Sequence, residues 1–351
     1  MKYIFDLAII GAGIVGINVT YFASLFRPEW KIILLDRDSA GQGASLYSAG
    51  LDTPLGRGLW HSYLTCRGRK LYSQYHCKIK AASSNPLQSL WIVKKNQVNE
   101  LKTSIVDGKL SFVRNPLQLE SLKKLGVILQ KDEVVFSLEG ISCSNVSNML
   151  RLILEKSLTN RNCNFCAMTN VREIIKEKNG YLKIIKEDND PIFARRIISS
   201  TGAWNSLSTH SELNQSDFKK VSALHINLTP SLSDPLLFFY GSGYFLLPLY
   251  SKGYWLMSLP SIKEHNFPKT LPPPINETEK NAAIAFLNQH APTFVKYIYG
   301  GRAFCDSYTN DRVPLVTPNI AAANHIDITG CSGSGYRLAP ALAEIALKLC
   351  F

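Results

Sequence analysis

The segment DLAIIGAGIVG, residues 6–16, determines the fold prediction. Residues 4–10 form a nearly continuous apolar run, which is typical of a strand buried on both faces of a parallel sheet. A glycine-rich turn follows at once and leads into an apolar helix that ends before Pro28. A second apolar strand, residues 31–35, closes with Asp36, twenty positions after Gly16. This order of strand, turn, helix, strand and acidic residue predicts a dinucleotide-binding βαβ unit.

Each glycine of this turn has a physical reason to be there. Gly11 allows the tight turn, Gly13 lets a pyrophosphate approach the backbone, and Gly16 lets helix and strand pack closely. The helix N-terminus offers free N–H groups and a positive dipole end to phosphates. Asp36 would accept hydrogen bonds from ribose hydroxyls. The alternative is a βαβ unit of the same form that holds no ligand.

A second glycine turn lies near the other end of the chain. A strand at residues 326–329 is followed by Gly330-Cys-Ser-Gly-Ser-Gly335 and then by a helix over about residues 338–349. A glycine-rich loop that runs into a helix N-terminus presents backbone donors and a positive dipole end to an anion. The alternative is a tight turn that only precedes a packing helix.

The residues between the two turns follow another pattern. Short strands separated by basic segments follow residue 86, and residues 223–258 contain aromatic, alternating segments with glycine turns, which predict antiparallel sheet. The chain has 351 residues, more than one ordinary domain usually holds. We therefore expect an α/β fold with a Rossmann-like domain and an interleaved α+β domain built on an antiparallel sheet.

Four stretches carry a resemblance to a known family. They are DR at 36–37 with GQGAS at 41–45 and SAG at 48–50, IISSTGAW at 197–204, GR at 301–302 with TND at 309–311, and GCSGSGYRLAP at 330–340. Together and in this order they resemble the FAD-dependent D-amino acid oxidase superfamily, which includes glycine oxidases and sarcosine oxidases. The resemblance covers the whole chain.

The resemblance implies FAD as the cofactor and a cap that binds the substrate. The FAD-binding domain would be discontinuous, residues 1–84, 140–220 and 305–351, and the cap would comprise residues 85–139 and 221–304. Residues from both glycine turns, from the loop after the second strand and from the ends of later strands would hold FAD. They are Gly11, Gly13, Ile14, Val15, Gly16, Asp36, Arg37, Ala44, Ser45, Ser48, Ala49, Gly50, Val171, Thr201, Gly202, Trp204, Gly330, Gly333, Ser334, Gly335, Tyr336, Arg337 and Leu338.

The implied activity is oxidation of the C–N bond of an amino acid or secondary amine. Hydride would pass to flavin N5, water would hydrolyse the imine product, and O₂ would reoxidise the flavin to give H₂O₂. Two alternatives stay open. One is an amine dehydrogenase that uses another electron acceptor, and the other is a non-catalytic flavoprotein that serves as an interaction subunit.

Four residues are candidates for the substrate side, and one for cofactor attachment. Arg302 matches the Gly-x-Arg position of glycine oxidase-like members, and Arg337 stands where sarcosine oxidase-like members have a carboxylate-binding Lys. A planar guanidinium suits such an anchor because it matches a carboxylate. Phe245 stands at the position of a substrate-binding Tyr, and Tyr244 adjoins it. Cys305 lies where sarcosine oxidase-like members attach FAD covalently, so a covalent link is a further possibility.

Composition narrows the class of protein. An apolar fraction of 46% suits a large core, and the formal net charge is +12. Eight irregularly spaced cysteines predict reduced thiols in a cytoplasmic protein, and neither they nor the seven histidines predict a metal site. No run of 18 apolar residues predicts a membrane span.

Basic residues gather in the first part of the predicted cap. A positive rim there favours an anionic or carrier-tethered substrate over a nucleic acid, because no aromatic residues are interleaved with the basic ones. The alternative is a solvated face. The residues are Lys94, Lys95, Lys102, Lys109, Arg114, Lys123, Lys124 and Lys131.

Overall fold

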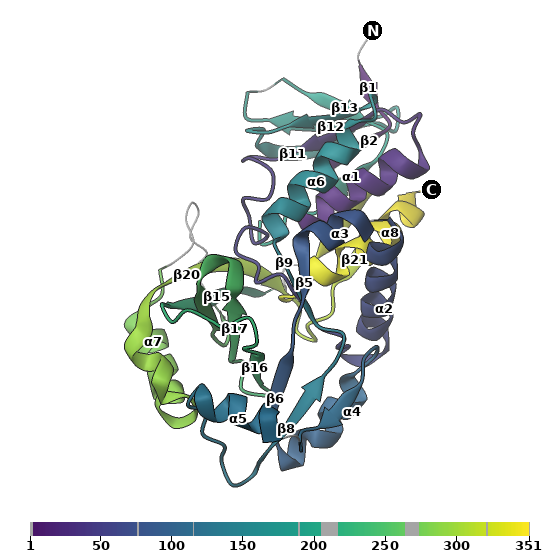
Figure 1. Cartoon of the computed structure of the whole chain (residues 1–351). Helices are drawn as coiled ribbons and strands as arrows, with labels where there is room; N and C mark the ends of the chain where they lie inside the picture. Colours follow the sequence, from purple (N-terminus) through teal and green to yellow (C-terminus); the bar gives the residue numbers. More distant parts are fainter. Residues whose placement is uncertain are drawn as a thin grey trace.

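The computed structural model describes residues 3–75, 77–114, 116–188, 190–204, 217–263, 274–320 and 322–350. Figure 1 shows two lobes, one with α1, α6 and α8 and the other with α5, α7 and the strands around β16. Both ends of the chain lie in the first lobe, although most of the second lobe comes from the middle of the sequence.

The first lobe is built on a six-stranded sheet in which the two ends of the chain meet. Strand β14 lies between β2 and β22 and pairs parallel with both, so the first and last parts of the sequence share one sheet. All neighbours in this sheet are parallel except β21 and β22. In order across the sheet the strands are β10 (Cys163–Cys166), β3 (Ile32–Leu35), β2 (Leu7–Ile10), β14 (Ile197–Ser199), β22 (Ala322–Thr329) and β21 (Leu315–Asn319).

Both faces of this sheet are covered, which explains its apolar strands. Leu7, Ile9 and Leu34 face a core made with the helices, whereas Ala8 and Ile33 face a small second sheet. The helices are α1 (Ile14–Phe26), α2 (Gly58–Tyr75), α3 (Cys77–Ser83), α6 (Val146–Leu158) and α8 (Gly335–Cys350). The second sheet has the order β1 (Ile4–Phe5), β13 (Ile192–Ala194), β12 (Leu182–Lys186) and β11 (Val171–Lys176).

The second lobe is a nine-stranded sheet that forms the floor of the cap. Its neighbours are antiparallel except β16 and β6, which pair in parallel, so the sheet is mixed where the sequence predicted antiparallel pairing. The path across it is β19 (Ile262–Lys263), β15 (Asp217–Ile226), β18 (Tyr254–Ser258), β17 (Phe245–Leu249), β16 (Leu236–Phe239), β6 (Ser89–Lys94), β8 (Glu133–Leu138) and β7 (Leu110–Phe112), with β20 (Ile298–Tyr308) also paired to β15.

Helices and short elements complete the second lobe and the junction. Helices α5 and α7 share a core with the outer face of the cap sheet, through residues such as Leu122, Leu287 and Trp255. The remaining elements are α4 (Val98–Ser104), α5 (Pro116–Lys124), α7 (Glu277–His290), the 3-10 helices η1 (Lys95–Gln97), η3 (Tyr250–Lys252) and η4 (Pro292–Tyr297), and a small sheet of β4 (Leu51–Asp52), β9 (Ser142–Ser144) and β5 (Ser84–Pro86).

Three of the predicted domain boundaries cut through strands, and the first of them, 84/85, falls inside the short strand β5. The boundaries at 220/221 and 304/305 fall inside β15 and β20, which pair continuously from Asp217 with Tyr308 to Ala223 with Arg302. The reason is that these two strands are long enough to cross from the cap to the first lobe. Within the described ranges, no helix is long and apolar enough to span a membrane.

Candidate active site

A cavity of about 980 Å³ lies between the two lobes and connects the two glycine turns. Its walls include Gly11 and Asp36 of the N-terminal unit, Gly333 and Gly335 of the C-terminal turn, and the inner face of the cap sheet. The volume is at the upper end of the range of about 300–1,000 Å³ that is usual for ligand pockets. The cavity is therefore large enough for an extended cofactor together with a small substrate.

The N-terminal turn needs glycine at two positions for packing alone. Gly11 has φ +99°, and a Cβ there would lie 2.5 Å from the carbonyl oxygen of Ser200. A Cβ on Gly16 would lie 1.8 Å from the carbonyl oxygen of Gly11. At Gly13, by contrast, a Cβ would meet only the Ser45 hydroxyl, at 3.3 Å. Gly16 therefore serves the packing of α1 on the sheet, and Gly13 leaves room on the side of the cavity.

Asp36 is fixed at the edge of the cavity by backbone donors. Its carboxylate accepts hydrogen bonds from the N–H of Ala12 at 2.6 Å and the N–H of Asp38 at 2.8 Å. Burial raises the pKa of Asp36, and these two N–H groups act in the opposite direction. The Ile14 N–H donates to the Ser45 hydroxyl at 2.9 Å, which ties the loop after β3 to the start of α1.

Most of the cofactor-binding residues predicted from the sequence line this cavity. They are Gly11, Gly13, Ile14, Val15, Asp36, Arg37, Ala44, Ser45, Ser48, Ala49, Gly50, Val171, Thr201, Gly202, Trp204, Gly330, Gly333, Ser334, Gly335, Tyr336 and Arg337. The Arg37 guanidinium stacks over the Trp204 ring at 4.0 Å, so these two side chains form one wall. Gly16 and Leu338 lie behind the lining and contact it only through packing.

The C-terminal turn is held by an acidic residue that the sequence analysis did not single out. Asp306 on β20 is buried and accepts hydrogen bonds from the N–H groups of Gly333 and Ser307, both at 2.9 Å. Gly330 and Gly333 have φ near +70°, as a tight turn requires. No motif in the sequence pointed to Asp306, which shares the cavity-facing side of β20 with Arg302 and Phe304.

Burial of Asp306 makes a pH-dependent stability expected. Burial raises its pKa from 3.8 to about 6. The folded protein therefore binds more protons than the unfolded chain across this window, and stability falls as pH rises through it. Between pH 4 and 7 we expect wild type to lose about 2 kcal/mol more unfolding free energy than Asp306→Asn. Urea unfolding of both proteins at the two pH values measures this, and parallel losses would contradict it.

The predicted substrate residues of the cap divide between the two faces of the sheet. Phe245 lines the cavity, in a cross-strand row with Ser258, Ala223 and Arg302. Tyr244 does not line it: its ring stacks on Phe286 of α7 at 4.1 Å, on the outer face. Successive residues of a strand face opposite ways, so Tyr244 cannot supply the hydroxyl that a tyrosine at position 245 would place in the cavity.

Cys305 is also turned away from the cavity. Its neighbours on β20, Phe304 and Asp306, line the cavity, while Cys305 is buried and does not. This geometry does not favour the covalent attachment of FAD that the resemblance left possible.

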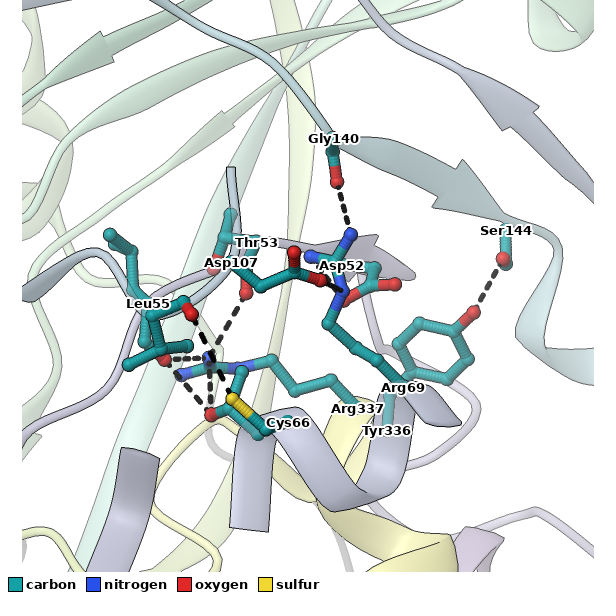
Figure 2. Close-up of polar contacts among 12 residues, drawn as sticks. Asp52, Thr53, Leu55, Cys66, Arg69, Asp107, Gly140, Ser144, Tyr336 and Arg337 are labelled. Atoms are coloured by element: carbon teal, nitrogen blue, oxygen red, sulfur yellow. Dashed lines mark hydrogen bonds and ion pairs between the residues drawn. The ribbon is translucent and has the colours of Figure 1, made fainter. Parts of the chain in front are cut away.

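Arg337 uses its guanidinium to hold the protein together. Figure 2 shows it pointing toward Thr53 and Leu55, and its Nη1 donates to both main-chain carbonyls and to the Thr65 hydroxyl. Its Nη2 donates to the Ser334 hydroxyl at 3.0 Å. Burial, followed by the charge of Arg57, lowers the pKa of Arg337 to about 10. The geometry thus favours a positioning role over the predicted role as substrate anchor.

We expect Arg337→Met to act on stability first. The Thr53 and Leu55 carbonyls would lose a charged donor, which costs on the order of 3 kcal/mol. Urea unfolding of the purified protein measures this. Unchanged stability combined with a raised KM for an acidic substrate would instead support the anchor role.

Arg302 lies on the cavity side of β20 with donors to spare. Its Nε is buried and has no hydrogen-bond partner among the described residues. Burial lowers the pKa of Arg302. The pKa of His225 is lowered first by burial and then by the positive charge of Arg302. Arg302 stays a candidate anchor for an anionic group.

One cavity between the two lobes joins the βαβ glycine turn, the second glycine turn from the other end of the sequence, and the cap sheet. This arrangement is typical of a nucleotide-cofactor protein of the flavoprotein type. The chain matches the model of the DAO family, described as FAD dependent oxidoreductase, over residues 6–349, and it belongs to that family. The family and fold predicted from the sequence are therefore confirmed.

Solved structures share this fold at low sequence identity. Glycine oxidase from Geobacillus kaustophilus is 13% identical, with a TM-score of 0.80 over 99% of this chain and 95% of that one. L-α-glycerophosphate oxidase from Mycoplasma pneumoniae with FAD bound is 16% identical, with a TM-score of 0.81 over 99% and 95%. Iminodiacetate oxidase from Chelativorans sp. BNC1 is 15% identical, with a TM-score of 0.77 over 98% and 95%. A search of curated proteins found no match.

The residues of the cavity fit FAD. Asp36 lies where a ribose would be bound, and the N-terminus of α1 opens onto the cavity beside Gly13, where the nearest described atom to a Cβ would be the Ser45 hydroxyl oxygen, at 3.3 Å. The N-terminus of α8 at Gly335 opens onto the same cavity. The Thr201 hydroxyl, buried on the wall between them, has no protein partner among the described residues.

Proposed function

We propose that this FAD-dependent oxidoreductase oxidises the C–N bond of an amino acid or secondary amine and passes the electrons to O₂. The observation that carries the proposal is the single cavity that joins both glycine turns and continues along the inner face of the cap sheet. FAD would supply the hydride acceptor. The protein then has to hold the cofactor, position the substrate carbon against it and exclude water.

The N-terminal half of the cavity would hold the cofactor's nucleotide part. The N–H groups and positive dipole end of α1 suit a pyrophosphate, and the Asp36 carboxylate suits the ribose hydroxyls. The backbone N–H groups around Gly335 and the dipole of α8 would stabilise negative charge on a reduced flavin ring.

The inner face of the cap sheet suits a small substrate. Phe238, Phe245 and Phe304 give it an apolar surface, and the Tyr47 ring stacks on Phe304 with centroids 5.4 Å apart. Such a wall excludes water from the reacting carbon, which protects an imine product from early hydrolysis. The substrate would be a small amine or amino acid, free or carrier-tethered, with its acidic group bound by an arginine of the cavity.

An anaerobic screen of amines and amino acids tests the proposal. We expect the flavin absorbance of the purified protein to bleach with at least one of them, and readmitted air to restore it with release of H₂O₂. Bleaching without peroxide would instead support a dehydrogenase that uses another acceptor. A flavin that no amine reduces would contradict the proposed function and leave the non-catalytic subunit.

A further inference from the structure

Two further arginines, Arg57 and Arg312, line the cavity between the lobes. Arg57 stands just before α2, in a loop held by the hydrogen bond from the Gly56 N–H to the Ser104 carbonyl, 2.8 Å. Arg312 stands in the turn after β20. Both line the cavity and are exposed at its edge. Partial burial of Arg57 in the cavity wall, and after it the positive charge of Arg312, lowers the pKa of Arg57.

The backbone at Arg312 suits glycine better than arginine. Its φ is +60°, in the left-handed region that few residues other than glycine adopt. The turn is closed by the Arg312 N–H, which donates to the Thr309 carbonyl at 3.1 Å, and by the Thr309 hydroxyl, which donates to the Val313 carbonyl at 2.9 Å. The chain therefore carries a second positive charge at a place where folding alone would favour glycine.

No carboxylate of the described residues neutralises this pair. No ion pair within 4 Å joins Arg57 or Arg312 to an acidic side chain in the described ranges. The acidic residues of the cavity wall have other partners. Asp36 accepts from backbone N–H groups, Asp38 pairs with Arg37, Glu100 accepts from the Tyr240 hydroxyl, and Asp306 accepts from the Gly333 and Ser307 N–H groups.

Arg312 lies near the C-terminal turn, because its N–H donates to the Thr309 carbonyl and the Thr309 N–H donates to the Ser332 hydroxyl at 3.3 Å. Tyr308 lines the same cavity, and a Cβ on Gly333 would lie 3.3 Å from the Tyr308 hydroxyl. Arg302 is six residues from Tyr308 on β20, which corresponds to about 20 Å along the strand. Arg302 and the end of β20 that leads to Arg312 are therefore separate places on the cavity wall.

We propose that Arg57 and Arg312 form an oxyanion-binding subsite beside the C-terminal turn, and that the substrate carries a carboxylate or phosphate that binds there. The substrate part of this proposal rests on the proposed function; the subsite itself does not. Two guanidinium forks can each bind an oxyanion bidentately, and the anion removes the repulsion between them.

Titration of the oxidised, flavin-bound protein with acetate and with inorganic phosphate tests the subsite. We expect one of the two anions to perturb the flavin spectrum in a saturable way and to raise the melting temperature. The tighter of the two identifies the group as a carboxylate or a phosphate. Arg312→Gly and Arg57→Gln should each weaken this binding by about tenfold or more, because each removes one charged fork.

Matched variants separate the subsite from general charge effects. Glycine suits φ +60° at position 312, so Arg312→Gly should fold at least as well as wild type. Arg312→Lys keeps the charge but loses the fork, so it should weaken anion binding less than Arg312→Gly does. The surface variant Arg151→Gln should leave anion binding within about threefold of wild type. Equal weakening in Arg151→Gln would reduce the effect to net charge and overturn the proposal.

The outcomes for the subsite and for the proposed function are distinguishable. Anion binding that depends on Arg57 and Arg312, in a protein whose flavin no amine reduces, would keep the subsite and overturn the amine oxidase. A flavin that amines reduce, with anion affinity equal in wild type and Arg312→Gly, would do the opposite. Absence of saturable binding by either anion to wild type would also overturn the subsite.

Discussion

Gly13→Asp is expected to yield a folded protein that purifies without flavin absorbance. The α-carbon of Gly13 faces the cavity at the N-terminus of α1, and the only atom within 3.4 Å of a Cβ there is the Ser45 hydroxyl oxygen. A carboxylate at this position would occupy the space for the pyrophosphate and repel it, and would itself satisfy the positive end of the helix. The ratio of visible to ultraviolet absorbance of the purified protein, with circular dichroism as the check on folding, measures the result.

Two control variants separate loss of the cofactor from loss of the fold. Gly300→Asp adds the same side chain on β20, at an exposed position where no atom lies within 4 Å of a Cβ, so it should keep its flavin. Gly16→Ala should fail to fold, because its Cβ would lie 1.8 Å from the Gly11 carbonyl oxygen. A Gly13→Asp protein with a full complement of flavin would contradict the assignment of this end of the cavity.

The sequence could predict those parts of the site that are local in the chain. The strand, turn, helix and acidic residue of the N-terminal unit lie within 36 residues, so hydrophobic period and glycine spacing specify them together. The same holds for the C-terminal turn, where Gly330 and Gly335 introduce α8. The two units meet in one sheet because β14, some 160 residues after β3, pairs with both β2 and β22. Only the resemblance to a family predicted this meeting.

The parts that the sequence could not predict depend on long-range pairing. The partners of Arg337 are carbonyls at positions 53 and 55, more than 280 residues away, so a buried positioning arginine and an exposed anchor look alike in the sequence. The parallel pairing of β6 with β16 is of the same kind. Arg57 lies in a loop without a motif and reaches the cavity only because the β4–α2 connection packs against α4.

A buried ion pair between Lys220 of β15 and Glu279 of α7 joins helix α7 to the cap sheet. The two side chains are 2% and 3% exposed, and Lys220 Nζ lies 2.6 Å from the Glu279 carboxylate. Lys220 also donates to the Pro274 carbonyl, and Glu279 accepts from the Ser222 hydroxyl at 2.6 Å and the Asn276 N–H at 2.9 Å. Burial alone would raise the pKa of Glu279, but Lys220, Ser222 and the Asn276 N–H together lower it.

Glu279→Ala is therefore expected to destabilise the protein by about 3–5 kcal/mol at pH 7, because it leaves a buried ammonium group without its partner. Since the pKa of Glu279 is lowered on folding, this contribution is present above its unfolded pKa of 4.5 and is lost as the pH falls through the folded pKa. The deficit of the variant relative to wild type should accordingly shrink in acid. Urea unfolding at pH 7 and in acid measures both effects.

Two control variants test whether the ion pair is the cause. Glu277→Ala, exposed on the same helix, should change stability by less than about 0.5 kcal/mol. The double variant Lys220→Met with Glu279→Leu should recover most of the loss, because no charge is then buried alone. Equal unfolding midpoints for Glu279→Ala and Glu277→Ala would show that the pair does not hold α7 on the cap sheet.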